Sequence, residues 1–271
     1  MSPSRTSLPF DLWLFDLDGT LVETAPEIAD AVNDTLAELG LAPVTQEAVR
    51  DWIGHGTREL LIQALAQRTG RAPDAVRADA RFAAQEAVFA RHYAARCGTR
   101  SHPYPHVVAT LQALRAAGAR LVVLTNKEGR YTDRVLDAHG LRPLFDRVIS
   151  GDTLPVKKPE PLGVEDSLLR YGVARTRCVL VGDSSIDVQT ARRARIAAWC
   201  VPYGYNMGRP IAEARPDRVV PDFSALLSGS SALLSVTGRP PLASASARAA
   251  ADVEPPKGTV SAAVSACSAN P

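Results

Sequence analysis

The sequence predicts an α/β protein, with a doubly wound, mainly parallel β-sheet and an inserted small all-helical cap domain. Three observations support this fold class. Short apolar runs bounded by turn residues recur along the chain, as buried parallel strands do. Segments with helical periodicity separate most of these runs. One gap between runs is far longer than a crossover needs, so we expect it to hold an insertion.

Five apolar runs are expected to form strands of the sheet. They cover residues 12–15, 121–124, 147–149, 178–181 and 197–201. Three helices are expected in the gaps, two of which end at a glycine that can adopt the left-handed conformation. These helices cover residues 106–117, 161–171 and 186–194.

The long gap, residues 22–101, is predicted to form the helical insertion. Thr24 and Glu27 have the spacing of a capping box and precede an apolar helical face. Further helices are predicted over residues 57–69 and 74–93.

The remaining boundaries follow from this insertion and from a change in composition. The α/β core is predicted to comprise residues 1–21 and 102–227. Residues 228–271 are rich in Ser, Ala, Pro and Gly and contain no aromatic residue. Such a segment cannot bury enough apolar surface to offset its ordering entropy, so we predict a disordered tail.

The composition indicates which classes of partner the protein can bind and in which cellular compartment we expect it. The net charge of +2 is too small to indicate a nucleic-acid or membrane partner. The four cysteines form no C-x-x-C pair and no zinc-like spacing with histidine, which indicates reduced thiols. The sequence contains neither a signal-peptide pattern nor an apolar stretch as long as a transmembrane helix. We therefore expect a cytoplasmic protein.

The first candidate motif is Asp16-Leu17-Asp18-Gly19-Thr20, directly after the first apolar run. Two carboxylates spaced i, i+2 at a strand end can face the same crevice. Gly19 lets the backbone turn so that amide groups point at an anion, and we group Thr20 with it as a substrate contact. The motif predicts an anion site that contains a nucleophile.

The second motif is Thr125-Asn126-Lys127, after the run at residues 121–124. A hydroxyl and an amide at a strand end can hold a phosphate oxygen without adding charge. The alternative is a plain helix N-cap.

The third motif is Lys157-Lys158-Pro159. A phosphate dianion that approaches an ionised carboxylate is repelled, so a cation must lie near both groups, and a lysine can supply it. The alternative is an ordinary solvated pair of surface lysines.

The fourth motif is Gly182-Asp183-Ser184-Ser185-Ile186-Asp187. Carboxylate ligands of this kind suit Mg²⁺, which binds through a few carboxylates together with the substrate phosphate. Asp183 is the expected direct ligand. Asp187 binds the metal, directly or through water, or else interacts with the dipole of the helix that it begins.

With these four motifs in this order, the chain resembles the haloacid dehalogenase superfamily over about residues 11–227. The resemblance implies that Asp16 is the nucleophile and Asp18 the general acid and base. It implies that Thr125 and Lys158 are phosphate ligands. It further implies that Mg²⁺ is held by Asp16, Asp183 and the backbone of Asp18, and that the helical insertion is a cap domain.

Further segments are similar to bacterial phosphoglycolate phosphatases, which implies that 2-phosphoglycolate is hydrolysed to glycolate and phosphate. They are Lys157-Lys158-Pro159, Tyr203-Gly204-Tyr205-Asn206 and Pro216-Asp217. Two departures concern the substrate. His106 stands where such proteins usually carry glycine, and the Lys-Pro loop, which runs straight from Pro161 into Leu162, is shorter than the common form.

Other functions compatible with these motifs are a phosphatase or mutase of another small sugar phosphate, or a non-catalytic phosphate-binding regulatory module. Asp18 argues against a dehalogenase, which needs no proton for an alkoxide, and against the non-catalytic module. The insertion contains no lysine, which excludes Schiff-base chemistry from the cap.

Selection of the substrate is expected from the turn Gly54-His55-Gly56 and the residues that follow it. His55 is a candidate substrate contact, with a plain loop residue as the alternative. Arg58 could pair with a substrate carboxylate, and the alternative is an exposed helix residue. The expected partner is a small phosphorylated metabolite, and the protein is expected to be a monomer or a homodimer.

Overall fold

The structure, a computed structural model, describes residues 8–230 of the chain. Most of the predicted tail therefore lies outside the described residues. Among the described residues, no helix has the length and apolar character needed to cross a membrane.

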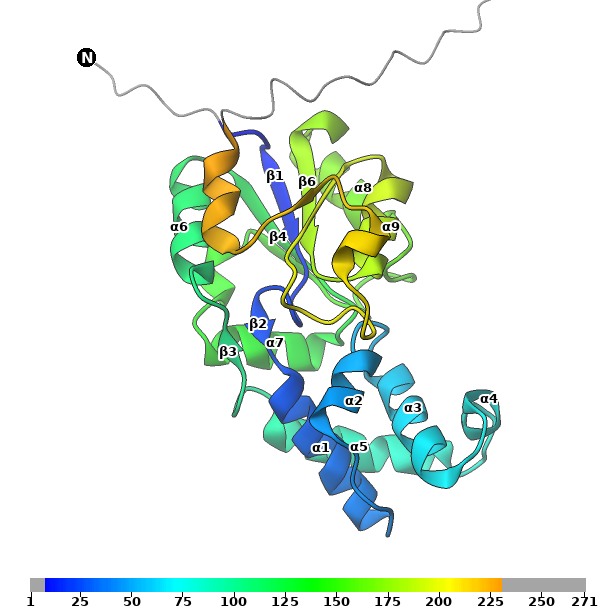
Figure 1. The fold of residues 1–271 in the computed structure, drawn as a ribbon. Coiled ribbons are helices and arrows are strands. Elements are labelled where there is room, and N and C mark those ends of the chain that lie inside the picture. Colours follow the sequence, from blue (N-terminus) through cyan, green and yellow to red (C-terminus); the bar gives the residue numbers. More distant parts are fainter. Residues whose placement is uncertain (1–7, 231–271) are drawn as a thin grey trace, which may run out of the picture. The chain divides into compact units, whose positions relative to one another are not determined.

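A six-stranded sheet forms the centre of the core (Figure 1). Its spatial order is β5-β4-β1-β6-β7-β8, and every neighbouring pair is parallel. The strands are β1 (Leu12–Phe15), β4 (Arg120–Leu124), β5 (Arg147–Ile149), β6 (Cys178–Gly182), β7 (Ala197–Cys200) and β8 (Arg218–Val219). The five predicted strands are confirmed to within one residue at either end. The sequence analysis missed β8, a two-residue edge strand without an apolar run.

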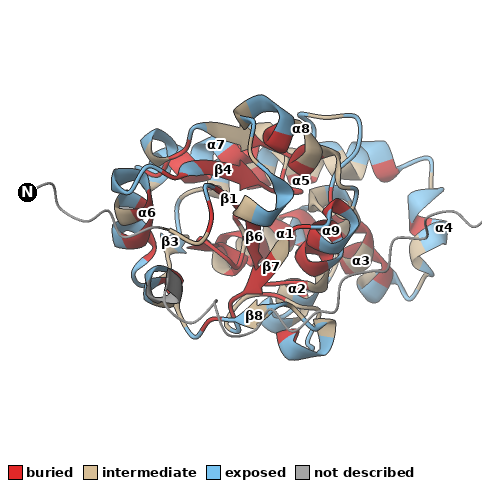
Figure 2. Cartoon of the chain, turned by 90° about the horizontal axis from the view of Figure 1, so that it is seen from above, coloured by how far each residue is buried: buried red, intermediate tan, exposed pale blue. Residues whose placement is uncertain are grey.

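Strand β1 separates two layers of core. Its side chains alternate between the faces of the sheet, so Trp13 and Phe15 pack in one apolar cluster while Leu12 and Leu14 pack in the other. All four are fully buried, and Figure 2 shows the sheet strands buried beneath helices that are exposed on their outer sides. Burial on both faces explains why the strands read as continuous apolar runs.

Four α-helices cover the sheet. They are α6 (Val107–Ala116), α7 (Gly129–Ala138), α8 (Leu162–Tyr171) and α9 (Ser185–Ala194). Short 3₁₀ helices cover Arg142–Leu144, Arg175–Arg177, Ile211–Ala214 and Phe223–Ser230. The three predicted core helices are confirmed, and α8 ends at Gly172 in the left-handed conformation. Helix α7 was missed because its sequence, GRYTDRVLDA, is mostly polar and only one narrow face is buried.

The segment between the short strands β2 (Val22–Glu23) and β3 (His102–Pro103) contains five helices. They are α1 (Ala25–Glu38), α2 (Gln46–Trp52), α3 (Thr57–Thr69), α4 (Pro73–Arg77) and α5 (Phe82–Arg96). The chain enters this segment through β2 and leaves it through β3, and these strands pair antiparallel. The helix predicted over residues 57–69 is confirmed as α3.

The single helix predicted over residues 74–93 is wrong, because the chain breaks between α4 and α5. Asp79 lies at the break, where its carboxylate accepts a hydrogen bond from the Arg81 backbone at 2.9 Å and pairs with the guanidinium of Arg71. An aspartate that bonds to nearby backbone competes with a continuous helix.

The predicted capping box at the start of α1 is also wrong. The hydroxyl of Thr24 donates instead to Asp18, at 2.7 Å. The amide groups of Thr24 and Ala25 both donate to the Tyr205 hydroxyl, at 3.0 Å each. Glu27 accepts from the backbone of Gly98 at 2.8 Å. The first turn of α1 is therefore capped by core residues rather than by its own side chains.

His106 precedes α6 with a φ of 69°, in the left-handed region that favours glycine. We expect His106→Gly to raise the free energy of unfolding by about 0.5–1 kcal/mol. The substitution removes the strain of a left-handed residue, and this gain exceeds the cost of the greater entropy that glycine gives the unfolded chain. Thermal and urea unfolding would measure the change, with kcat unaffected. A lower stability of the variant would show that the imidazole makes a contact worth more than the strain.

Candidate active site

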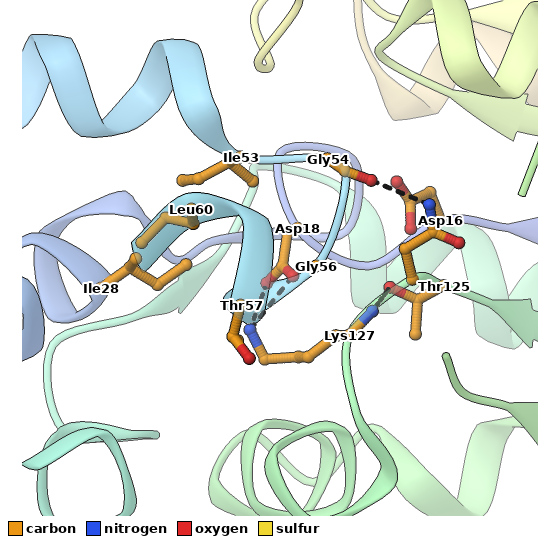
Figure 3. A pocket seen from close by; sticks show the side chains of 11 residues that line it. Asp16, Asp18, Ile28, Ile53, Gly54, Gly56, Thr57, Leu60, Thr125 and Lys127 are labelled. Carbon is orange, nitrogen blue, oxygen red and sulfur yellow. Dashed lines mark hydrogen bonds and ion pairs between the residues drawn. The ribbon is translucent and has the colours of Figure 1, made fainter. Parts of the chain in front are cut away.

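The four sequence motifs meet at the carboxyl edge of the sheet, where open α/β sheets bind ligands. Asp16 follows β1, Thr125 follows β4 and Asp183 follows β6, while Lys158 reaches the same place from the loop after β5. Figure 3 shows the cavity at this edge.

Asp16 is buried next to a lysine ammonium. Its Oδ1 lies 2.9 Å from Lys158 Nζ and accepts a hydrogen bond from the Leu17 backbone at 2.7 Å. Burial raises the pKa of Asp16 to about 6, and the charge of Lys158 opposes this increase. Asp16 is therefore a desolvated carboxylate beside a fixed cation, as a nucleophile that must approach a phosphate requires.

Lys158 is shared between two carboxylates. Its ammonium lies 2.6 Å from Asp187 Oδ1 as well as 2.9 Å from Asp16. Burial alone would lower the pKa of Lys158, but the two carboxylate charges outweigh burial and raise the pKa. The other oxygen of Asp187 accepts hydrogen bonds from the Ser184 backbone and hydroxyl. Asp187 thus holds Lys158 in place and caps α9.

Asp183 is buried and held by two donors. The Thr20 hydroxyl and the Tyr205 amide each donate to it at 2.5 Å. Burial, together with the charges of Asp16 and Asp187, raises the pKa of Asp183 well above its ordinary range. Close packing explains the nearby Gly204, because a side chain there would overlap the Asp183 carboxylate.

The donor set fits a divalent cation. Oxygen atoms of Asp16, Asp183 and Asp187 all lie within 4.8 Å of one another. With Asp18, the described residues place four carboxyl groups and two ammonium groups here, the latter from Lys127 and Lys158. When all four carboxyl groups are ionised, two negative charges lack a cationic partner among buried groups, and a divalent ion with a preference for oxygen would neutralise them.

Asp18 forms an ion pair that the sequence analysis did not anticipate. Lys127 Nζ lies 2.8 and 3.0 Å from the two oxygens of Asp18 and 5.0 Å from the centre of the Tyr93 ring of α5. The Lys127 side chain is only 1% exposed. The scarcity of lysine, and the place of Lys127 directly after Thr125-Asn126, were the signals that could have identified it.

Two polar contacts tie the Gly54-His55-Gly56 turn to the core, and a third ties the following residue, Thr57. Asn126 Nδ2 donates to the Gly54 carbonyl at 2.9 Å, and Lys157 Nζ donates to the His55 carbonyl at 2.6 Å. The Thr57 hydroxyl donates to Glu128 at 2.5 Å. The amide group of Asn126 also donates to the Lys158 carbonyl, so this side chain joins the turn to the lysine loop.

The cavity is lined by a polar half from the core and a largely apolar half from the insertion (Figure 3). The core contributes Asp16, Asp18, Thr125, Asn126 and Lys127. The insertion contributes Ile28, Ile53, Gly54, Gly56, Thr57 and Leu60. A ligand here would be held by charge on one side and by apolar contact on the other.

Four residues that the sequence analysis assigned to substrate do not line this cavity. Arg58 pairs with Glu86 at 2.7 Å, and the hydrogen bond of His55 to the core is made by its backbone carbonyl rather than its ring. Gly19 and Thr20 pack against Asp183 instead. Their amide groups donate within the turn, to the carbonyls of Val22 and Leu17, so they do not point at an anion.

Comparison with known proteins identifies the family. Residues 13–201 match the family of haloacid dehalogenase-like hydrolases. A phosphoglycolate phosphatase of Thiobacillus denitrificans is 39% identical over 217 residues, which cover 80% of this chain and 94% of that protein. One of Vibrio cholerae is 37% identical over 216 residues, covering 79% and 93%.

Solved structures give the same result. The crystal structure of a predicted phosphoglycolate phosphatase from Haemophilus somnus is 31% identical with a TM-score of 0.76, and the match covers 84% of this chain and 99% of that one. A structure of CbbY from Rhodobacter sphaeroides in complex with phosphate is 25% identical with a TM-score of 0.67, and the match covers 80% and 96%. The resemblance drawn from the motifs is confirmed: the chain belongs to the haloacid dehalogenase-like hydrolase family.

Proposed function

We propose that this enzyme hydrolyses a phosphate monoester through a phosphorylated Asp16, with Mg²⁺ as cofactor and 2-phosphoglycolate as substrate. The observation that carries the proposal is the buried ion pair of Asp16, which lines the cavity, with Lys158, and the position of Asp183 close to Asp16. Such a pair provides a nucleophile together with the charge that lets a phosphate dianion approach it.

In the proposed reaction an oxygen of Asp16 attacks phosphorus and the bond to the leaving oxygen breaks. Asp18 gives its proton to that oxygen, and the alcohol leaves. Water then attacks the aspartyl-phosphate and loses a proton to Asp18, which releases inorganic phosphate and restores both carboxyl groups. Thr125 and Lys158 hold the phosphate oxygens during both steps.

In this proposal Asp16, Asp183 and the backbone of Asp18 hold Mg²⁺, which when bound offsets charge on the phosphate. Asp187 acts on the metal site through Lys158 and the Ser184 loop, since both of its oxygens already accept hydrogen bonds. Residues 22–101 serve as the cap and residues 1–21 with 102–227 as the catalytic core.

Mg²⁺ should raise the Tm of metal-free protein by about 5–10 °C at a hundredfold excess over Kd. The shift should grow between pH 5 and pH 7. Because the pKa of Asp16 is raised in the folded protein, its contribution to the free energy of unfolding is complete below the ordinary pKa of 3.8 and is lost as the pH rises through about 6. The ionised Asp16 then destabilises the fold, so a bound cation restores more stability at pH 7 than at pH 5. Differential scanning calorimetry after chelation would measure this dependence.

Asp183→Asn is the matched control for the metal shift. It should raise the Tm of the metal-free protein, because it removes a buried charge that Asp16 and Asp187 repel. It should also abolish most of the Mg²⁺ shift. An unchanged shift in this variant would place the cation elsewhere.

The relatives named as phosphoglycolate phosphatases support 2-phosphoglycolate as the substrate. A kinetic screen with Mg²⁺ over small phosphate monoesters, with p-nitrophenyl phosphate as a generic substrate, tests the choice. We expect kcat/KM to be highest for 2-phosphoglycolate. A preference for a sugar phosphate would assign that compound as the substrate instead. Absence of turnover with every monoester would overturn the phosphatase proposal.

The proposed partner is a small phosphorylated metabolite rather than a nucleic acid or a membrane. The proposed compartment is the cytoplasm, and the proposed assembly is a monomer or a homodimer. Sedimentation of the purified protein would measure the assembly.

A further inference from the structure

Lys127 is the only cationic residue that lines the cavity, among the residues that the structure describes. It follows Thr125 and Asn126 after β4, and its ammonium is directed at the cavity beside Asp18 (Figure 3). Arg58, the cation that the sequence analysis expected to pair with a substrate carboxylate, is paired with Glu86 and lies against the Phe82 ring of α5.

Lys127 pairs with the residue that is proposed as the general acid and base. Both oxygens of Asp18 lie within 3.0 Å of Lys127 Nζ, and no other described acidic group forms an ion pair with this lysine. The Lys127 side chain is 1% exposed, so its ammonium is largely shielded from water. An ammonium has three donors, so Lys127 can also hold an anionic group that enters the cavity beside Asp18.

A leaving group with its own carboxylate fits this position. In 2-phosphoglycolate the carboxylate is separated from the leaving oxygen by one methylene group. Asp18 must be within hydrogen-bond reach of the leaving oxygen to protonate it, so the substrate carboxylate lies near Asp18 and its lysine partner. The substrate carboxylate can then pair with the Lys127 ammonium.

We propose that Lys127 is the specificity residue that binds the carboxylate of the leaving group. This inference rests on the proposed phosphatase function. It predicts that monoesters with a carboxylate next to the leaving oxygen react faster than neutral ones, because the buried ammonium of Lys127 pairs with that carboxylate.

The test compares 2-phosphoglycolate with 2-hydroxyethyl phosphate, in which a neutral CH₂OH replaces the carboxylate. In the unaltered enzyme with Mg²⁺ we expect the first to have the higher kcat/KM. In Lys127→Met the ratio of the two kcat/KM values should fall roughly 10- to 100-fold, the range for a lost charge-assisted hydrogen bond. The ratio does not depend on the fraction of folded enzyme, so partial misfolding cannot produce the result.

Two further variants sharpen the comparison. Lys127→Arg keeps the charge and should retain more of the ratio than Lys127→Met. Arg130→Met removes an exposed cation three residues further along, which lies over the Tyr131 ring, and should leave the ratio unchanged.

The outcomes separate this inference from the proposed function. If the unaltered enzyme prefers 2-phosphoglycolate and Lys127→Met keeps that preference, the role of Lys127 is overturned and the phosphatase proposal stands. If the unaltered enzyme shows no preference between the two esters, the proposed substrate fails, and the role of Lys127 fails with it.

Discussion

Asp16→Asn should reduce kcat on the order of 10⁴-fold or more with every phosphate monoester, since the amide cannot form the covalent intermediate. Rapid acid quench of the unaltered enzyme with radiolabelled substrate should trap one phosphate on Asp16, and the variant should trap none. Phosphate found on another residue, or retained turnover, would assign the nucleophile elsewhere.

The control for this variant is its stability. The Asp16→Asn substitution leaves Lys158 with Asp187 as its remaining carboxylate partner, at 2.6 Å, so the lysine stays compensated. We therefore expect the variant to fold and to unfold cooperatively like the parent. An inactive but misfolded protein would say nothing about the nucleophile, and circular dichroism distinguishes the two cases.

Asp18→Asn should lower kcat by about 10²–10⁴-fold, the usual contribution of a general acid and base. The two chemical steps should respond differently. With p-nitrophenyl phosphate the leaving group needs little protonation, so we expect a burst of p-nitrophenol followed by slow turnover as the aspartyl-phosphate accumulates. Linear release at nearly the parent rate would show that Asp18 is not the base in the second step.

Loss of the Asp18 charge also leaves Lys127 unpaired, so stability must be measured beside turnover. Removing one partner of a buried pair typically costs about 3–5 kcal/mol. The double variant Asp18→Asn, Lys127→Met should recover much of that stability but none of the lost turnover. Recovery of both would mean that Asp18 acts only as a structural partner.

The strands and the convergence of the motifs could be predicted because they depend on local sequence. Four apolar residues before Asp16 make a buried strand, and the parallel arrangement brings the strand ends to one edge. The family, and with it the fold class, was recognisable from the same motifs.

The details that failed depend on contacts between distant parts of the chain. Thr24 and Glu27 have capping-box spacing, but the hydroxyl of Tyr205, far along the chain, supplies the cap. Lys127 belongs to the second motif, but its contacts with Asp18 and Tyr93 come from segments far away in the sequence. Local spacing indicates which partner a side chain can have, and the tertiary fold decides which partner it has.

The pairing of β2 with β3 determines how the helical segment between these strands can be exchanged. Glu23 and His102 face each other across this antiparallel pair, so the chain leaves the core and returns to it at a separation of roughly 5 Å. A two-residue hairpin turn spans that distance. The helical segment between them can thus be exchanged for one of different length without altering the register of β1 or β4. Under the proposed function, such an exchange would alter the apolar half of the cavity while Asp16, Asp18 and Thr125 stay in place.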